Sequence, residues 1–153
     1  MNSLNAASTE GTGFERSPFW HLLGMRVLTE RPGYAEVELP VRPELLQVQG
    51  VVHGGVISAL ADSAAAAAFR LIAPDEPIST IELTVTYIAP VKEGRLVARA
   101  EILSARRRIF VADVRITDGD GSLIAVARAV YRRFSPARPA TMAGPARSAD
   151  GPA

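Results

Sequence analysis

The sequence contains no cysteine, and this absence removes several classes of chemistry. A chain without thiols forms no disulfide, binds no cysteine-ligated zinc and carries no thiol nucleophile. An excess of charge is also missing, because 17 basic and 16 acidic residues leave a formal net charge of +1. Such a chain generates no global field that would attract nucleic acid or a membrane surface. We therefore expect neither of these partners.

Long uninterrupted apolar runs are absent as well. The longest run, residues 56–69, is interrupted by Asp62 and is too short to span a bilayer. The first residues, MNSLNAASTEGTG, lack the basic start and apolar core of a signal peptide, which favours a cytoplasmic location. The 153 residues are 48% hydrophobic and 22% charged, which is typical of one globular domain that buries its core without disulfides or metals.

Composition divides the chain into one domain and two tails. Residues 1–13 are small and polar, and residues 136–153 are rich in proline, alanine and glycine. Both stretches are predicted to be disordered because they offer little apolar surface to bury. Residues 14–135 then form a single domain of about 120 residues, an ordinary domain size.

The pattern of apolar residues predicts one long buried helix and several strands. Residues 56–72 are alanine-rich and apolar nearly all round, which is typical of a central helix. A short helix that starts at Pro18 and is closed by Gly24 precedes it. Alternation of apolar and polar residues predicts strands over residues 26–41, 80–88, 96–103, 109–117 and 123–134.

The order of these elements predicts an α+β fold in which an antiparallel sheet wraps the helix. The strands after the helix are expected to follow one another as a meander, with a hairpin turn at residues 118–121. Alternation within residues 80–88 places Thr80 on the face opposite Tyr87. Long strands leave open sheet edges, which favours pairing with a second copy of the chain.

The candidate chemistry lies in the stretch QVQGVVHGGVISALADS, residues 47–63. A helix that begins near Gly54 presents unpaired backbone N–H groups at the positive end of its dipole, and glycine lets a carbonyl oxygen approach closely. Such a helix start can stabilise an oxyanion without a charged side chain. The alternative is a Gly-Gly turn in which His53 is a helix cap or a hydrogen-bonded core histidine.

Asp62 is the second candidate, because it lies among alanines and no Lys or Arg stands three or four residues away. Burying an unpaired carboxylate costs on the order of several kcal/mol. In the structural interpretation, Ser58 at position i−4 forms a hydrogen bond with it. In the functional interpretation, Asp62 is a nucleophile or general base held in a dry pocket.

The spacing of Gly54 and Asp62 constrains any joint role. Eight residues of helix span about 12 Å at 1.5 Å per residue. Catalytic groups that act on one carbonyl must converge to roughly hydrogen-bond reach. Two residues of one helix therefore cannot serve the same substrate. If both are catalytic, each site combines Gly54 of one subunit with Asp62 of another, which predicts a homodimer.

Taken together, these residues resemble the signature of hotdog-fold acyl-CoA thioesterases, in the branch related to phenylacetic-acid-degradation thioesterases. The resemblance runs from about residue 19 to residue 134 and rests on Gln47, the run Gly50 to Gly55, Asp62 and the strand before Pro90. It implies a hotdog fold with five to six antiparallel strands around a long central helix. It also implies hydrolysis of an acyl- or aryl-CoA to free acid and CoA by a homodimer with shared sites, assembled as a dimer of dimers.

The resemblance implies a role for each matching position. The Gly54 N–H would polarise the thioester carbonyl, and Gln47 would help His53 hold that carbonyl or the start of the helix. Asp62 of the opposite subunit would act as nucleophile or as base for water, and Thr80 would orient that water. No metal is implied, and no cofactor beyond the coenzyme A of the substrate.

Further positions are candidates for binding the substrate, namely Gly55, Val56, Ser63, Phe69 and Tyr87. Arg106, Arg107 and Arg108 stand where relatives often have basic residues near the coenzyme A phosphates, and a solvated basic turn is the alternative. The competing function is a non-catalytic acyl-CoA-binding or sensing protein on the same fold, which the presence of Asp62 disfavours. Apolar lining residues fit both fatty and aromatic acyl groups, so the sequence does not select between them.

Overall fold

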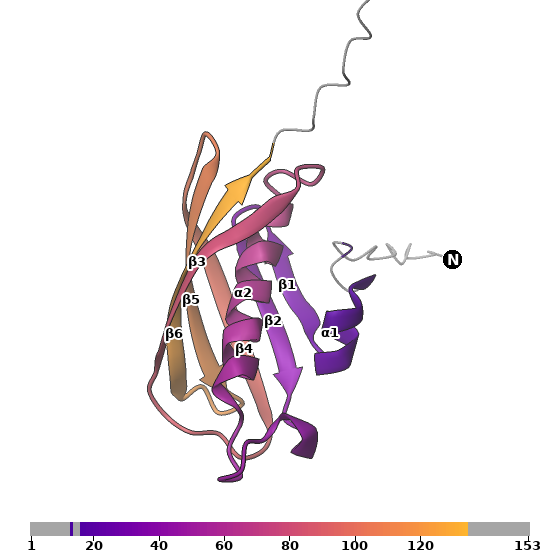
Figure 1. Cartoon of the computed structure of the whole chain (residues 1–153), viewed down its shortest axis with the longest axis vertical. Coiled ribbons are helices and arrows are strands. Elements are labelled where there is room, and N and C mark those ends of the chain that lie inside the picture. The colour runs from indigo at the N-terminus through magenta and orange to yellow at the C-terminus, as the bar shows by residue number, and fades with distance from the viewer. Residues whose placement is uncertain (1–12, 14–15, 135–153) are drawn as a thin grey trace, which may run out of the picture.

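A long helix lies against a six-stranded antiparallel sheet in the computed structural model, which describes Gly13 and residues 16–134 (Figure 1). The predicted α+β arrangement is therefore confirmed. The predicted tails lie outside the described residues, apart from Gly13. The elements are α1 (Pro18–Leu23), β1 (Arg26–Arg31), β2 (Tyr34–Pro40), the 3₁₀ turn η2 (Pro43–Leu45), α2 (Gly54–Arg70), β3 (Ile78–Tyr87), β4 (Arg95–Arg106), β5 (Ile109–Asp118) and β6 (Leu123–Arg133).

The central helix α2 combines strong helix propensity with small side chains. Five consecutive alanines, residues 64–68, are all buried, and they let the helix lie close to the sheet. Leu60 and Phe69 are 0% and 1% exposed and fill the space that the alanines leave. The helix begins at Gly54 and ends at Arg70, two residues earlier at each end than predicted. Among the described residues, no helix is long and apolar enough to span a membrane.

The strand predicted over residues 26–41 is two strands, so that prediction is wrong. β1 and β2 pair antiparallel and are joined at Pro32-Gly33, where Gly33 has a φ of 81°. Proline has no N–H to donate to a ladder, and glycine adopts positive φ readily, so a tight turn forms here. The alternation of Ala35, Val37 and Leu39 that favoured one long strand lies entirely after the turn, and Pro32-Gly33 is itself a turn signal.

The strand order β1-β2-β4-β5-β6-β3 differs from the predicted meander. Of the strands after the helix, only β4, β5 and β6 follow one another as neighbours, while β3 pairs with β6 at one edge of the sheet. Residues 88–94 carry the chain from β3 back to β4, past the two strands that lie between them. As a result, β3 has a strand partner on one side only within this chain.

A β-bulge at Ile81 changes which residues of β3 face the helix. Thr80 pairs with Tyr131 and Glu82 pairs with Val130, so Ile81 is the extra residue of the ladder and is 56% exposed. Strict alternation predicted Thr80 on the face opposite the apolar residues of the strand. That prediction is wrong, because an extra residue reverses the parity and turns the Thr80 side chain toward α2.

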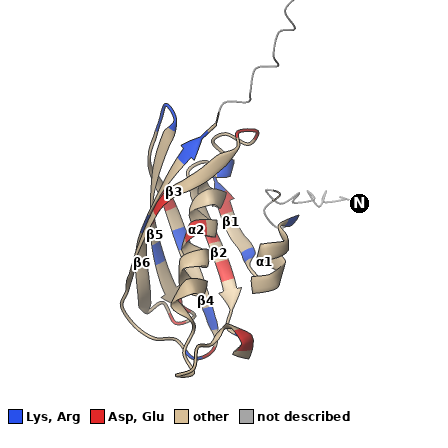
Figure 2. Cartoon of the chain, viewed as in Figure 1, with Lys and Arg blue, Asp and Glu red and all other residues tan. Residues whose placement is uncertain are grey.

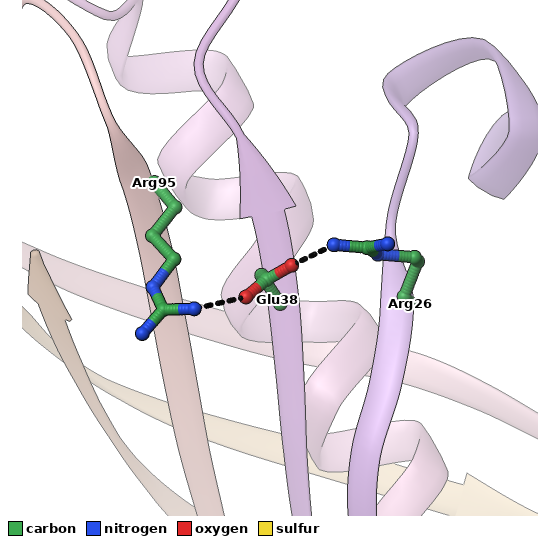
Figure 3. Close-up of polar contacts among 3 residues, drawn as sticks. All are labelled: Arg26, Glu38 and Arg95. Atoms are coloured by element: carbon green, nitrogen blue, oxygen red, sulfur yellow. Dashed lines mark hydrogen bonds and ion pairs between the residues drawn. The ribbon is translucent and has the colours of Figure 1, made fainter. Parts of the chain in front are cut away.

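Glu38 is a buried acid on the sheet face turned away from α2. It is 3% exposed, and Arg26 of β1 and Arg95 of β4 each donate to one of its carboxylate oxygens (Figure 3). The hydrogen bond from Arg26 is the main cause that lowers the pKa of Glu38 below its ordinary value. These contacts tie three neighbouring strands together through one side chain.

Candidate active site

His53 and two glycines build the start of α2. Nδ1 of His53 accepts the N–H of Gly55 at 2.8 Å, and its carbonyl oxygen accepts the N–H of Val56 at 2.9 Å. His53 is therefore the N-cap, which was one form of the alternative interpretation, and its exposure excludes the other form, a core histidine. No acceptor among the described residues takes the N–H of Gly54. That N–H is left as a donor at the positive end of the helix dipole.

Tyr87 packs directly against this helix start. Its hydroxyl donates to the carbonyl oxygen of Gly54 at 3.1 Å and lies 2.7 Å from Oγ of Ser58. A Cβ at Gly54 would stand 3.2 Å from Cζ of Tyr87, tighter than ordinary van der Waals contact, so glycine lets the two lie together without displacement of the ring. Ser58, considered above as a partner of Asp62, contacts Tyr87 instead, and that structural interpretation is wrong.

Asp62 is half-buried in the middle of α2 and is held by two hydroxyl groups. Thr80 donates to its Oδ1 at 2.9 Å, and the Tyr131 hydroxyl lies 2.8 Å from the same oxygen. The Tyr131 hydroxyl also lies 2.6 Å from the main-chain oxygen of Asp62. Within the described part of the chain, Asp62 forms no ion pair and its Oδ2 receives no hydrogen bond. One carboxylate oxygen is thus anchored while the other stays available.

Sequence reasoning missed Tyr131. The inward positions of β6 are Ala125, Ala127 and Ala129, and Tyr131 continues that alternation at 2% exposure. A phenol at the end of a buried alanine series needs a hydrogen-bond partner, and this signal could have found it. Burial, followed by the nearby Asp62 carboxylate, raises the pKa of Tyr131 far above its ordinary value. Its hydroxyl is therefore a neutral donor.

Helix α2 keeps the residues around Gly54 apart from the residues around Asp62. α2 is continuous from Gly54 through Asp62, and eight helical residues span about 12 Å. Both groups face β3, with Tyr87 beside Gly54 and Thr80 beside Asp62. The structure therefore brings the predicted residues together in two pairs and does not bring the pairs to one another.

Gln47 lies in the loop that precedes α2, and its side-chain amide engages that loop. Its Oε1 accepts the backbone N–H of Gln49 and its Nε2 donates to Oε1 of Gln49, both at 3.0 Å. The turn is completed by Gly50, whose N–H donates to the carbonyl oxygen of Gln47 at 2.8 Å and whose φ is 73°. In this arrangement Gln47 shapes the loop leading to the helix start.

The remaining apolar and small candidates lie at different depths. Val56 is half-buried, and Ser63 is 8% exposed. Phe69 is 1% exposed and packs on Phe110 with ring centroids 3.7 Å apart, close to the end of α2 opposite Gly54. Phe69 therefore belongs to the core of this chain and offers almost no surface to a ligand.

Arg106, Arg107 and Arg108 form the tip of the β4–β5 hairpin, where Figure 2 shows basic residues gathered. All three are exposed, and they line a hollow of about 770 Å³ together with Glu76 and Arg133. The tip lies at the end of the molecule where α2 finishes (Figure 1). Among the described residues, no group of three or more His, Cys, Asp or Glu side chains could hold a metal ion.

A long helix against a six-stranded antiparallel sheet, with glycine at the helix start and an acid two turns later, defines the hotdog thioesterase fold. The chain belongs to the thioesterase superfamily, whose sequence profile matches residues 49–125. The fold, family and enzyme class predicted from the sequence are therefore confirmed.

Known proteins similar to this chain agree with that assignment. The 1,4-dihydroxy-2-naphthoyl-CoA hydrolase of Listeria monocytogenes is 31% identical over 69% of this chain and 87% of its own length. The structure of a mutant of the phenylacetic acid degradation protein PaaI from Thermus thermophilus is similar with a TM-score of 0.72 and 33% identity, covering 77% of this chain and all of that one. The structure of protein PA5202 of Pseudomonas aeruginosa is similar with a TM-score of 0.74 and 29% identity. It covers 77% of this chain and 94% of PA5202.

Proposed function

We propose that this protein is an acyl-CoA thioesterase that hydrolyses an acyl- or aryl-CoA to the free acid and coenzyme A. One observation carries the proposal: Asp62 is held at Oδ1 by two hydroxyl groups, while Oδ2 is left without a donor from the described residues. A carboxylate fixed in this way suits a nucleophile or a general base. The name of the Listeria relative, which specifies a CoA thioester, supports the substrate class.

In the proposed reaction, the Gly54 N–H donates to the carbonyl oxygen of the thioester. The negative charge that develops on this oxygen then sits at the positive end of the α2 dipole. Oδ2 of Asp62 either takes a proton from the water that attacks the carbonyl carbon or attacks that carbon itself. In the general-base route the C–S bond of the resulting tetrahedral intermediate breaks, and the proton that Asp62 took from water passes to the thiolate of coenzyme A. In the nucleophilic route the C–S bond breaks as a mixed anhydride forms on Asp62. Water then hydrolyses this anhydride, which releases the acid, restores the carboxylate and leaves a proton for the thiolate. Thr80 donates to Asp62, so its oxygen lone pairs remain to orient the water.

Each active site in this proposal is shared between two copies of the chain. Gly54 and Asp62 of one helix are about 12 Å apart, too far to act on one carbonyl. The edge strand β3 carries Thr80 near its start and Tyr87 at its end. Two such strands that pair antiparallel about a two-fold axis bring the start of one beside the end of the other. Asp62 of one copy then meets Gly54 of the second.

The arginine hairpin supports a coenzyme A substrate. Arg106 and Arg108 flank a hollow of about 770 Å³ that also includes Arg133, against a single acid, Glu76. Guanidinium groups match phosphate through their planar arrangement of donors, so we assign the hairpin to the coenzyme A phosphates. The dimer of dimers and the cytoplasmic location stay predictions of the sequence.

The competing function is a non-catalytic acyl-CoA-binding protein. A binding protein has no evident use for a half-buried carboxylate that lacks a positively charged partner among the described residues. A panel of aryl-, short-chain and long-chain acyl-CoAs distinguishes the two, with released thiol measured for the wild type and Asp62→Ala. We expect rapid hydrolysis of at least one member by the wild type and loss of that activity in the variant. Equal rates for the two proteins across a broad panel would rule the enzyme out.

A further inference from the structure

Tyr131 occupies a position beside Asp62 that no sequence motif assigned. Its hydroxyl lies 2.8 Å from Oδ1 of Asp62 and 2.6 Å from the main-chain oxygen of the same residue. The side chain is 2% exposed on the inward face of β6, so core packing fixes where the hydroxyl stands. Because one hydroxyl contacts both the carboxylate and the backbone of Asp62, it restrains the side-chain torsion of that residue relative to the helix.

Two donors converge on one oxygen of the carboxylate. Thr80 donates to Oδ1 at 2.9 Å, on the same atom that the Tyr131 hydroxyl reaches. Thr80 and Tyr131 are also cross-strand partners in the β3–β6 ladder, so a single rung of the sheet sets both donors. The single proton of the Tyr131 hydroxyl is shared between Oδ1 and the main-chain oxygen of Asp62. Oδ1 is thus anchored by Thr80 and by this shared proton, while Oδ2, which accepts no hydrogen bond from the described residues, keeps its lone pairs for other atoms.

We propose that Tyr131 is a positioning residue that anchors Oδ1 of Asp62 and thereby presents Oδ2 to the thioester or to the attacking water. The inference rests on the proposed thioesterase function and adds a residue to its machinery. Tyr131 acts through Asp62 and does not itself contact the substrate.

The chemistry of a phenol suits this role better than that of a cation. Burial, and next the Asp62 carboxylate, raise the pKa of Tyr131, which keeps the hydroxyl protonated as a neutral donor. A lysine or arginine at the same place would form an ion pair and reduce the charge that makes the carboxylate reactive. Tyr131 and Thr80 are the side chains of the described chain that bond to Asp62, and neither carries a charge.

The variant Tyr131→Phe tests this inference because it keeps the ring in the core and removes the hydroxyl alone. We expect kcat for a CoA thioester to fall by about 10-fold to 100-fold, the effect of losing one hydrogen bond to a charged group. KM should stay unchanged, since no substrate contact is removed. The acidic limb of the pH–kcat profile should move to higher pH, because the carboxylate anion loses a donor. The matched control Tyr34→Phe removes a phenol hydroxyl that bonds Glu36, and it should leave kcat, KM and the acidic limb unchanged.

A second variant carries 3,5-difluorotyrosine at position 131, which keeps the shape and makes the hydroxyl a stronger donor. Its acidic limb should move to lower pH, opposite to Tyr131→Phe. An unchanged kcat and profile in both variants, with an active wild type, would overturn the role of Tyr131 and leave the proposed thioesterase function intact. A fall in kcat that accompanies a lower Tm without any movement of the limb would assign a structural role and overturn it equally. A wild type that hydrolyses no CoA thioester would instead overturn the proposed function.

Discussion

Thr80 and Tyr131 face each other across strands β3 and β6, and their hydroxyl groups reach the same oxygen of Asp62. This meeting depends on the bulge at Ile81, which turns Thr80 toward the helix. The acid half of the candidate site is therefore built by an irregularity in the sheet as much as by the helix that carries Asp62.

The amide variant Asp62→Asn tests the carboxylate with little change in shape. An amide oxygen still accepts from Thr80, so the fold should persist, but an amide neither attacks a thioester nor takes a proton from water. We expect kcat to fall by roughly 10²-fold to 10⁴-fold, the usual contribution of such a group. Thiol release measures the rate, and Asp75→Asn in the exposed loop after α2 is the matched control. Comparable activity in the two variants would remove Asp62 from the mechanism.

The variant Gly54→Ala tests the helix start. Its new Cβ would stand 3.2 Å from Cζ of Tyr87, closer than ordinary contact, so the ring must shift away from the helix start that it packs against. Since the thioester carbonyl is proposed to bind at this N–H, we expect kcat/KM to fall by about tenfold or more, as for other misplaced groups in active sites. The control Gly119→Ala places a Cβ at an ordinary 3.4 Å from Arg95 and should keep full activity. A fully active Gly54→Ala enzyme would contradict the assignment.

The buried acid Glu38 predicts a pH-dependent contribution to stability. Its pKa is lowered in the folded state, so the ionised form stabilises the fold above the ordinary carboxyl value of 4.5. This contribution is lost as the pH falls from about that value through the lower pKa of the folded state. Glu38→Gln mimics the protonated acid, and we expect it to reduce the free energy of unfolding at pH 7 by about 1–3 kcal/mol, since the arginine partners are exposed.

Urea unfolding at several pH values measures this difference between the wild type and Glu38→Gln. The two proteins should converge in stability as the solution is acidified. The control Glu101→Gln alters an exposed glutamate of β4 and should behave like the wild type throughout. A constant difference at every pH would show that ionisation of Glu38 is not the cause.

The hairpin arginines predict a substrate-dependent effect on KM. The double variant with Arg106→Ala and Arg108→Ala should raise KM for a CoA thioester by about tenfold, because charge-assisted bonds to phosphate are lost. A thioester of N-acetylcysteamine, which lacks the phosphates, should show no change. Steady-state kinetics with both substrates provide the measurement, and Arg115→Ala on β5 is the control. Equal changes for the two substrates would favour a solvated turn.

Local sequence patterns predicted much of this architecture. Alanine content and apolar character located α2 to within two residues, and the eight-residue spacing of Gly54 and Asp62 separated the two half-sites. The periodicity of single segments did not predict that β3 pairs with β6, because pairing between distant strands depends on the whole fold. The predicted sheet face of Thr80 was wrong for a related reason. The bulge residue Ile81 reverses which side chains of β3 point toward α2, and nothing in the local sequence marks it.

Tyr131 shows what such patterns leave unassigned. The strand was predicted, but Tyr131 was not singled out within it, and its partner Asp62 lies 69 residues earlier in the chain. A hydrogen bond of that range becomes visible only when helix and sheet are packed together.

Each active site is proposed to take Gly54 from one subunit and Asp62 from another, and mixing two inactive variants tests this sharing most directly. Asp62→Ala removes the acid, and Gly54→Pro removes the N–H at a position where a helix tolerates proline. Each variant alone should be inactive. Heterodimers purified by two different tags should contain one complete site and recover about half the wild-type activity per dimer, one site of the two that symmetry provides. Heterodimers that form but stay inactive would contradict the shared site.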